Sequence, residues 1–212
     1  MPSRQRTIDF LVAACLVVTF ASLFFGRLMI YPVAIARGTF LERVAAEPEA
    51  WHVGHRVMLV GMIGLIPAAI GLRRTLRDRS PWLCDIAVAL VVVGAALGVG
   101  QYALDFAMAA AAEIESPEAG ERFLKALKSD EFVQWAFYRL PNVGQLGLIL
   151  VTVALWRQGP GWRLPAALVT LAAVTALAGP FLFGAMAARV AMGISLLGFS
   201  AVAWKIAAGP SN

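Results

Sequence analysis

The sequence predicts an all-α integral membrane protein, built as a bundle of six transmembrane helices. Three observations carry this prediction. First, 60% of the 212 residues are hydrophobic and only 15% are charged, whereas a soluble domain usually contains about 25% charged residues. Second, the apolar residues fall in runs that approach the roughly 20 residues a helix needs to cross a bilayer. Third, all six tryptophans lie at the ends of these runs, where the half-polar indole ring favours the lipid headgroups.

We expect one membrane domain, residues 1–212, with short loops and little chain left for a water-soluble domain. The spans are predicted at residues 9–33, 55–73, 83–112, 135–156, 164–183 and 188–206. The first span follows a basic segment and in this respect resembles a signal peptide. Its apolar run continues through Phe24 and Phe25 to Tyr31, which favours a retained helix over a cleaved one.

Charged residues sort by loop, and this sorting predicts the orientation. If six spans alternate, basic residues gather on one side: Arg4, Arg6, Arg73, Arg74, Arg77, Arg79, Arg157, Arg163 and Lys205. Acidic residues are concentrated in the loops of the other side. Because cytoplasmic loops carry an excess of Arg and Lys, both termini are predicted to be cytoplasmic, in a multi-pass protein of a bacterial cytoplasmic (inner) membrane. The net charge of +5 then reflects topology, and no nucleic-acid partner is expected.

Two stretches of the chain, residues 40–74 and 123–157, align without gaps at a constant offset of 83, with ten of 35 positions identical. The identities include arginines and glycines, namely Arg56/Arg139, Arg74/Arg157, Gly61/Gly144 and Gly64/Gly147. Apolar bias alone does not readily produce such matches, so we interpret the alignment as a duplicated helical hairpin. Arg189 and Gly193 open the last span in the same way and mark a weaker third copy. Such copies share one orientation and are related by an axis along the membrane normal.

Two loops on the acidic side are predicted to contain short amphipathic helices. Thr39 and Glu42 have the spacing of a capping box, in which side chains and backbone amides bond reciprocally at the start of a helix. After Pro117, an apolar stripe runs among charged residues and comprises Phe123, Leu124 and Leu127. We expect both helices to lie at the membrane surface.

Polar side chains are costly inside a bilayer, so those at membrane depth are the candidate functional residues. They are Arg27, His55, Arg56, Gln101, Tyr102, Asp105, Arg139, Asn142, Gln145 and Arg189. All belong to the outer half of the bilayer, whereas the cytoplasmic half is nearly bare of polar side chains. A channel or pump needs a polar path through the whole thickness, so this asymmetry favours a site that faces the outer side. We expect these side chains to converge on one pocket, in which Arg27 and Asp105 are able to pair.

The candidate cluster is cationic, with four arginines and one aspartate. Guanidinium groups match phosphate and carboxylate oxygens with paired hydrogen bonds, which predicts binding of an anionic amphiphile such as a phospholipid, a polyprenyl phosphate or another acidic lipid. The expected partners are membrane lipids, together with another membrane subunit or a second copy of the chain. An alternative is an intramembrane enzyme acting on a lipid or isoprenoid, with His55 or Asp105 as acid or base. A small transporter is a further alternative, and anchoring of each arginine at the headgroups is the purely structural one.

Neither a metal site nor a cofactor is predicted. His52 and His55 share a helical face, but these are the only two histidines, so a metal would need carboxylate ligands as well. A haem held by two histidines would need them on different spans. Cys15 and Cys84 match no metal or redox spacing and are interpreted as small packing residues.

Overall fold

The structure is a computed structural model that describes residues 4–113, 117–183 and 185–209. These residues form helices and no strand, which confirms the all-α class. The long helices are α1 (Arg4–Met29), α4 (Pro48–Leu76), α5 (Pro81–Ala112), α8 (Val143–Arg157), α9 (Arg163–Phe183) and α10 (Ala185–Ala208). With α8 extended by the helical turns before it, six segments are long and apolar enough to cross a membrane, as a six-span integral membrane protein requires.

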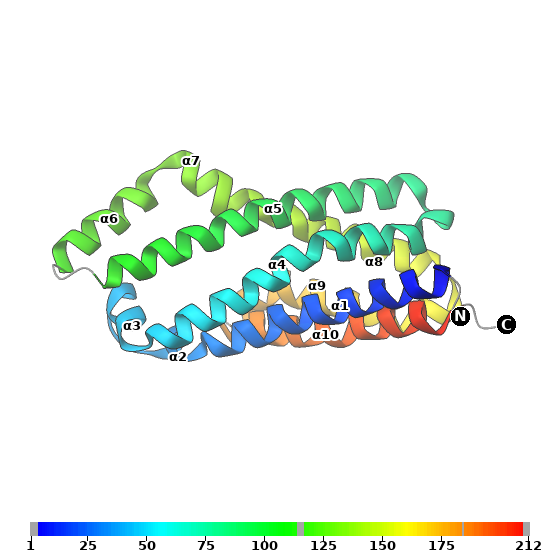
Figure 1. Cartoon of the computed structure of the whole chain (residues 1–212), viewed down its shortest axis with the longest axis horizontal. Helices are drawn as coiled ribbons and strands as arrows, with labels where there is room; N and C mark the ends of the chain where they lie inside the picture. The colour runs from blue at the N-terminus through cyan, green and yellow to red at the C-terminus, as the bar shows by residue number, and fades with distance from the viewer. Residues whose placement is uncertain (1–3, 114–116, 184, 210–212) are drawn as a thin grey trace.

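The six long helices form a closed ring that follows the order of the chain. α1 packs against α4, α4 against α5, α5 against α8, α8 against α9 and α9 against α10, and α10 then closes the ring on α1. The helices lie side by side along the long axis of the molecule, and both chain termini lie at the same end (Figure 1). We call this the terminal end, and the opposite end the cap end.

The terminal half of the bundle is filled by an apolar core to which all six long helices contribute. Leu16 of α1, Leu155 of α8 and Val202 of α10 are almost fully buried there. Phe20 of α1 and Phe199 of α10 stack face to face where these two helices close the ring, with centroids 3.9 Å apart. At this level the first and last long helices are therefore joined by an aromatic stack within the apolar core.

Glycines allow the helices of two neighbouring pairs to approach closely. A Cβ atom on Gly94 of α5 would lie 2.6 Å from the Cα of Gly144 on α8. A Cβ on Gly61 of α4 would lie 2.9 Å from backbone atoms of Thr19 and Leu23 on α1. Contacts this short are available only where no side chain intervenes, which is the usual role of glycine between membrane helices.

Two predicted spans are less regular than the sequence indicated. The first was predicted as one helix to residue 33, but α1 ends at Met29 and a separate helix, α2 (Tyr31–Ile35), follows with Pro32 in its first turn. The fourth begins as a π-helical segment, η2 (Gln134–Arg139), and a 3-10 turn, η3 (Leu140–Asn142), before α8 starts. Pro141 lacks the N–H that a regular α-helix would use at this point, and the backbone changes its hydrogen-bonding pattern around it.

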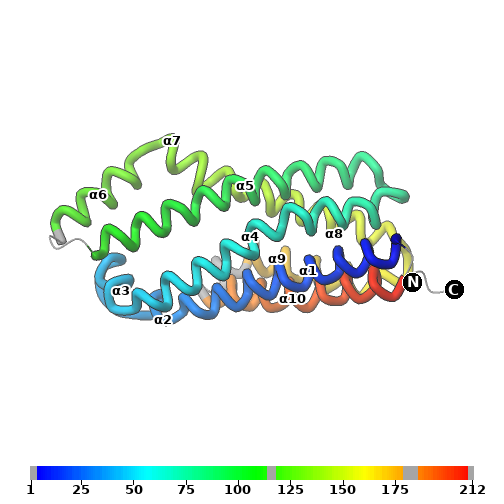
Figure 2. Tube along the Cα trace, viewed as in Figure 1, coloured from blue at the N-terminus to red at the C-terminus, as the bar shows by residue number. Residues whose placement is uncertain are grey.

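A cap of short helices stands on the first two helix pairs. It consists of α2, α3 (Phe40–Ala46), α6 (Pro117–Ser129) and α7 (Glu131–Val133), with the adjoining turns of α4 and α5. α5 has 32 residues and is about 48 Å long, so it exceeds a hydrocarbon layer of about 30 Å. α9 and α10 are shorter and end before they reach the level of α3 and α6 (Figures 1 and 2).

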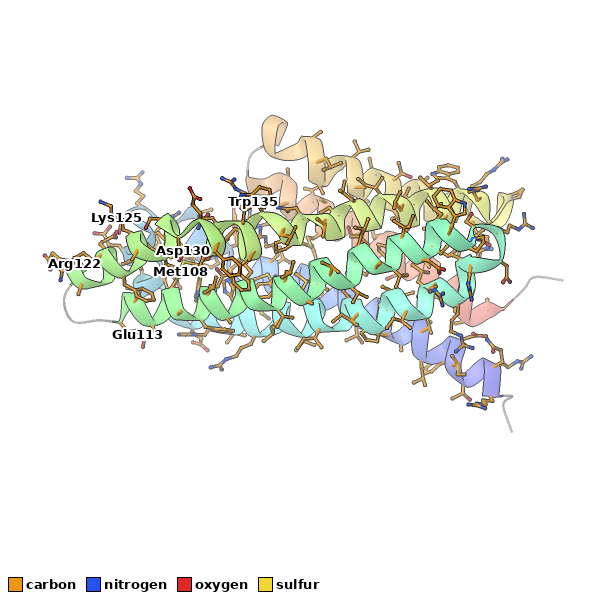
Figure 3. The ribbon with its side chains drawn as sticks, turned by 90° about the horizontal axis from the view of Figure 1, so that it is seen from above. Met108, Glu113, Arg122, Lys125, Asp130 and Trp135 are labelled. Atoms are coloured by element: carbon orange, nitrogen blue, oxygen red, sulfur yellow. The ribbon has the colours of Figure 1, made fainter. Side chains whose placement is uncertain are left out.

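The cap has small apolar cores of its own. One joins Val33, Val44, Trp51 and Ala109, and the other joins Leu41, Met108, Ala111 and Leu124. The predicted capping box of α3 is confirmed, since Thr39 Oγ1 accepts from the Glu42 amide and Glu42 Oε2 accepts from the Thr39 amide. The helix predicted after Pro117 is also confirmed as α6, and Figure 3 shows its Arg122 and Lys125 at the far end of the cap.

Candidate functional site

A buried histidine–aspartate pair joins α4 to α5 just below the cap. His55 Nε2 lies 3.5 Å from Asp105 Oδ2, and the two side chains are only 4% and 10% exposed. The other ring nitrogen, His55 Nδ1, lies 2.8 Å from the carbonyl oxygen of Trp51, one turn earlier in α4. A carbonyl oxygen can only accept a hydrogen bond, so Nδ1 carries a proton in this geometry. Nε2 is thereby directed at the carboxylate.

Trp51 holds the pair from above. Its indole Nε1–H donates to the backbone oxygen of Asp105 at 3.1 Å, and its ring lies 4.0 Å from the imidazole of His55. Phe40 of α3 packs edge-on against the same indole. The sequence identified Trp51 only as a boundary residue. Its position four residues before His55, on the same helical face, was the signal that marked it as a partner.

Tyr102 connects this pair to a second group of side chains. It precedes Asp105 by about one turn of α5, and its ring meets the imidazole of His55 edge-on at 5.8 Å. Tyr102 is also close enough to both Arg27 and Asp105 to interact with their charges. Tyr102 therefore links the histidine–aspartate pair to Arg27 of α1.

The second group centres on Arg189 of α10. Arg189 is only 7% exposed, and its guanidinium carbon lies 3.9 Å from the centroid of the Tyr31 ring. Such cation–π contacts contribute up to about 2 kcal/mol where both partners are shielded from water. Arg27 of α1, which is half-buried, lies within electrostatic reach of Arg189. Two guanidinium groups from opposite ends of the chain are thus brought to the same place.

An open groove begins at Arg189 and follows α10 toward the terminal end. Its volume is about 480 Å³. Apart from Arg189, its lining is glycine and apolar side chains: Phe24 of α1, and Val190, Gly193, Ile194, Leu196 and Leu197 of α10. Val190 and Leu197 are also exposed on the outer surface of the bundle. The groove is therefore an apolar depression on the lateral surface of the bundle, with one cationic side chain, Arg189, at its cap end.

Several of the predicted site residues are not brought together. Arg56, Arg139, Asn142 and Gln145 are exposed, and Gln101 is half-buried. Arg139 lies over the Trp135 ring at 5.7 Å, and the Asn142 amide donates to the backbone oxygens of Tyr138 and Arg139. The polar side chains therefore do not all converge on a single pocket. Asp105 also meets His55, rather than forming the ion pair with Arg27 that the sequence allowed.

Helix rotation explains why two of the predicted arginines point away. Arg56 directly follows the buried His55, and successive residues of an α-helix are turned by about 100°. Arg139 likewise follows Tyr138, whose hydroxyl lies 4.0 Å from the sulfur of Met108 on α5. His55 and Tyr138 are 83 residues apart, which is the offset of the sequence alignment. In both aligned segments the residue that faces inward is thus the one before the arginine. Tyr138 was therefore missed among the residues predicted from the sequence.

The two histidines contact different carboxylates. His52 Nε2 lies 3.6 Å from Glu113 Oε1 in an exposed pair, whereas His55 meets the buried Asp105. Across the described ranges, no group of three or more His, Cys, Asp or Glu side chains is placed to hold a metal ion. The HxxH spacing therefore acts here as two separate links between α4 and α5.

Comparison with known proteins adds no family to this description. No protein-family model, no curated protein and no solved structure matches the chain. The proposals below are therefore drawn from the geometry of the cap end and from the charges of the sequence.

Proposed function

We propose that this chain is a multi-pass membrane protein that binds an anionic amphiphile at the cap end of α1 and α10. One observation carries the proposal. The guanidinium of Arg189 is buried against Tyr31 at the head of a groove that is otherwise lined by glycine and apolar side chains. A molecule with a negative headgroup and a hydrocarbon chain has the shape and charge that such a surface complements.

Charge at membrane depth supports this class of ligand. Trp204 lies fifteen positions after Arg189 in α10, a rise of about 22 Å. Trp204 is strongly exposed near the terminal end, where an indole ring favours the headgroups. Arg189 then lies inside a hydrocarbon layer of about 30 Å. A phosphate or carboxylate headgroup at this depth accepts paired hydrogen bonds from its guanidinium.

The orientation we propose places the cap outside and both termini in the cytoplasm. The basic segments that the positive-inside rule assigns to the cytoplasm include Arg4 and Arg6 at the start of α1, Arg73 and Arg74 in the last turn of α4, and Arg77 directly after it. These segments belong to the terminal end of the bundle. A bacterial cytoplasmic membrane with its outer leaflet facing the cap is the setting that fits this sorting.

Three hairpins with a common ancestor account for the ring. The first two pairs, α1 with α4 and α5 with α8, use glycines at equivalent positions, Gly61 and Gly144, to meet the preceding helix. His55 and Tyr138 occupy equivalent positions and both face α5. The third pair, α9 with α10, has Arg189 four residues before Gly193, whereas in the first two copies the arginine lies five residues before the glycine. In this copy the arginine itself is buried, and we propose that the ligand site evolved there.

The test is selective retention of anionic lipid. The purified protein is placed in nanodiscs that contain phosphatidylcholine with a small share of phosphatidic acid, and bound lipid is counted by native mass spectrometry. We expect Arg189→Gln to lower the retention of phosphatidic acid by tenfold or more, and Arg27→Gln to lower it less. Arg56→Gln is the matched control, because Arg56 is exposed and does not line the groove that begins at Arg189. Equal retention of the two lipids by the unaltered protein would refute the proposal.

An intramembrane enzyme is the second candidate, and the His55–Asp105 pair is the observation that favours it. A positioned imidazole with a carboxylate partner is a common acid–base arrangement, and Tyr102 links it to Arg27. Asp105→Asn should then abolish conversion of a lipid or isoprenoid phosphate while the protein still assembles. The lipid products of Asp105→Asn and of the unaltered protein are extracted and compared by mass spectrometry. Identical products from the two proteins would refute the enzyme hypothesis.

A transporter is less well supported. Its substrate has to pass the terminal half of the bundle, and that half is filled by apolar side chains from all six long helices. A site that opens sideways toward the bilayer fits this packing better than a path along the axis.

A further inference from the structure

We infer that the ligand is a long-chain anionic lipid whose hydrocarbon chain lies in the groove between α1 and α10. It reaches Arg189 laterally, from within the bilayer. This inference rests on the proposed function and narrows it. The proposed function requires only that a negative headgroup bind the arginines. The groove adds a second requirement, a chain that runs from the headgroup toward the terminal end.

The groove has the position that such a chain needs. Its lining residues on α10 run from Arg189 to Leu197, and these positions are about 12 Å apart along the helix axis. Arg189 lies at the cap end of this run, and every other residue that lines the groove is glycine or apolar. A lipid with its headgroup toward the cap has the same order of polarity along its length.

Gly193 keeps the groove open. It lies one turn below Arg189, and a Cβ atom there would come 3.3 Å from the ring of Phe24 on α1. A larger side chain would occupy the space between α1 and α10 directly beneath the guanidinium. The chain of a bound lipid would then be excluded while Arg189 and its contact with Tyr31 remained.

Access from water is restricted where access from the bilayer is open. Tyr31 of α2 covers the guanidinium of Arg189 at 3.9 Å, and Val33 of the same helix is buried in the cap. The flank of the groove is formed by Val190 and Leu197, both exposed on the outer surface of the bundle. A ligand that diffuses within the leaflet reaches this flank directly.

Charge decides which headgroup is bound, because the apolar lining of the groove does not distinguish one headgroup from another. Lipid tails are as apolar as the leucines they would replace, so placing a chain against the protein gives little gain over leaving it in the bilayer. Paired hydrogen bonds to guanidinium are specific to phosphate or carboxylate. We therefore expect the arginines to select the headgroup, and the groove to admit only ligands whose chain fits it.

Two ligands and two variants separate this inference from the proposed function. The protein in phosphatidylcholine nanodiscs is titrated with long-chain phosphatidic acid and, separately, with water-soluble dihexanoyl phosphatidic acid. We expect Gly193→Phe to weaken binding of the long-chain lipid by tenfold or more and to leave the short-chain lipid within twofold. Arg189→Gln should weaken both. Leu171→Phe, at an exposed position on α9, is the control for a new ring on the lipid-facing surface.

The possible results separate cleanly. If Gly193→Phe leaves the long-chain lipid unaffected while Arg189→Gln weakens both ligands, the groove is wrong and the proposed function stands. If Arg189→Gln affects neither ligand, both fail.

A labelling experiment on the unaltered protein covers the case in which Gly193→Phe does not assemble. Phosphatidic acid and phosphatidylcholine, each with a photoreactive diazirine in the acyl chain, are irradiated in turn. The inference predicts several-fold more labelling of residues 186–197 by the anionic lipid, and equal labelling by the two lipids would overturn it.

Discussion

The two halves of the bundle are held together by different means. The terminal half is closed by apolar side chains from six helices, with Leu16, Leu155 and Val202 almost fully buried. The cap half carries the buried contacts that involve ionisable side chains, His55 with Asp105 and Arg189 with Tyr31. Packing of apolar groups is non-directional, whereas a buried polar contact depends on a particular partner. Stability is therefore expected to reside mainly in one half and recognition in the other.

The largest effect should come from the apolar half. Leu155→Ala removes a side chain with 0% exposure at the centre of the core, and the lost contacts and the remaining cavity should cost about 2–5 kcal/mol. Thermal unfolding in detergent, compared with the exposed control Leu171→Ala, measures this cost. Equal melting temperatures for the two variants would mean that the core of the terminal half does not hold the bundle together.

A smaller and more local effect is expected at the junction with the cap. Asp105→Ala leaves the Nε2 of a buried His55 without the carboxylate that faces it, which should cost about 1–3 kcal/mol. Hydrogen exchange should rise in the first turns of α4 and the last turns of α5, and stay unchanged in the terminal half. Asp130→Ala, which alters an exposed helix cap elsewhere, is the control. Uniform exchange across the whole bundle would contradict the division into two halves.

The smallest effect is expected from an arginine that the sequence singled out. Arg56 is exposed, and surface substitutions usually change stability by less than about 0.5 kcal/mol. Arg56→Gln should therefore unfold at the same temperature as the unaltered protein and retain the same lipids. A loss of either property would show that the side chain acts on the cap after all, and that the two groups of polar residues are coupled.

The fold was predictable to the extent that it depends on local composition. Apolar runs gave the six spans, and the Thr39–Glu42 spacing gave the start of α3. The interruptions of the helices were harder to predict. The sequence shows Pro32 and Pro141, but it does not show which hydrogen-bonding pattern replaces that of a regular α-helix. The early start of α4 at Pro48, ahead of the predicted residue 55, arises because the cap buries turns that lie beyond the apolar run.

The candidate residues were harder to group than to find. His55, Asp105 and Arg189 were identified because polar residues at membrane depth are costly. Which of them face one another depends on helix rotation and on the ring order, and neither is encoded in the spacing of charges alone. The roles of Trp51, Tyr102 and Tyr31 depend on the same tertiary arrangement. Tyr102 was among the predicted residues, and the spacing of Trp51 to His55 was a local signal. Tyr31 carried no such signal, because aromatic residues at span ends are expected in any membrane protein.

The most direct test of the central claim is a crystal structure grown in a lipidic mesophase doped with long-chain phosphatidic acid. Our account predicts headgroup density within hydrogen-bonding distance of the Arg189 guanidinium, continued by a chain beside Phe24 and Gly193. Ordered lipid elsewhere on the surface, with the groove filled by protein side chains and Arg189 bonded only within the chain, would contradict it.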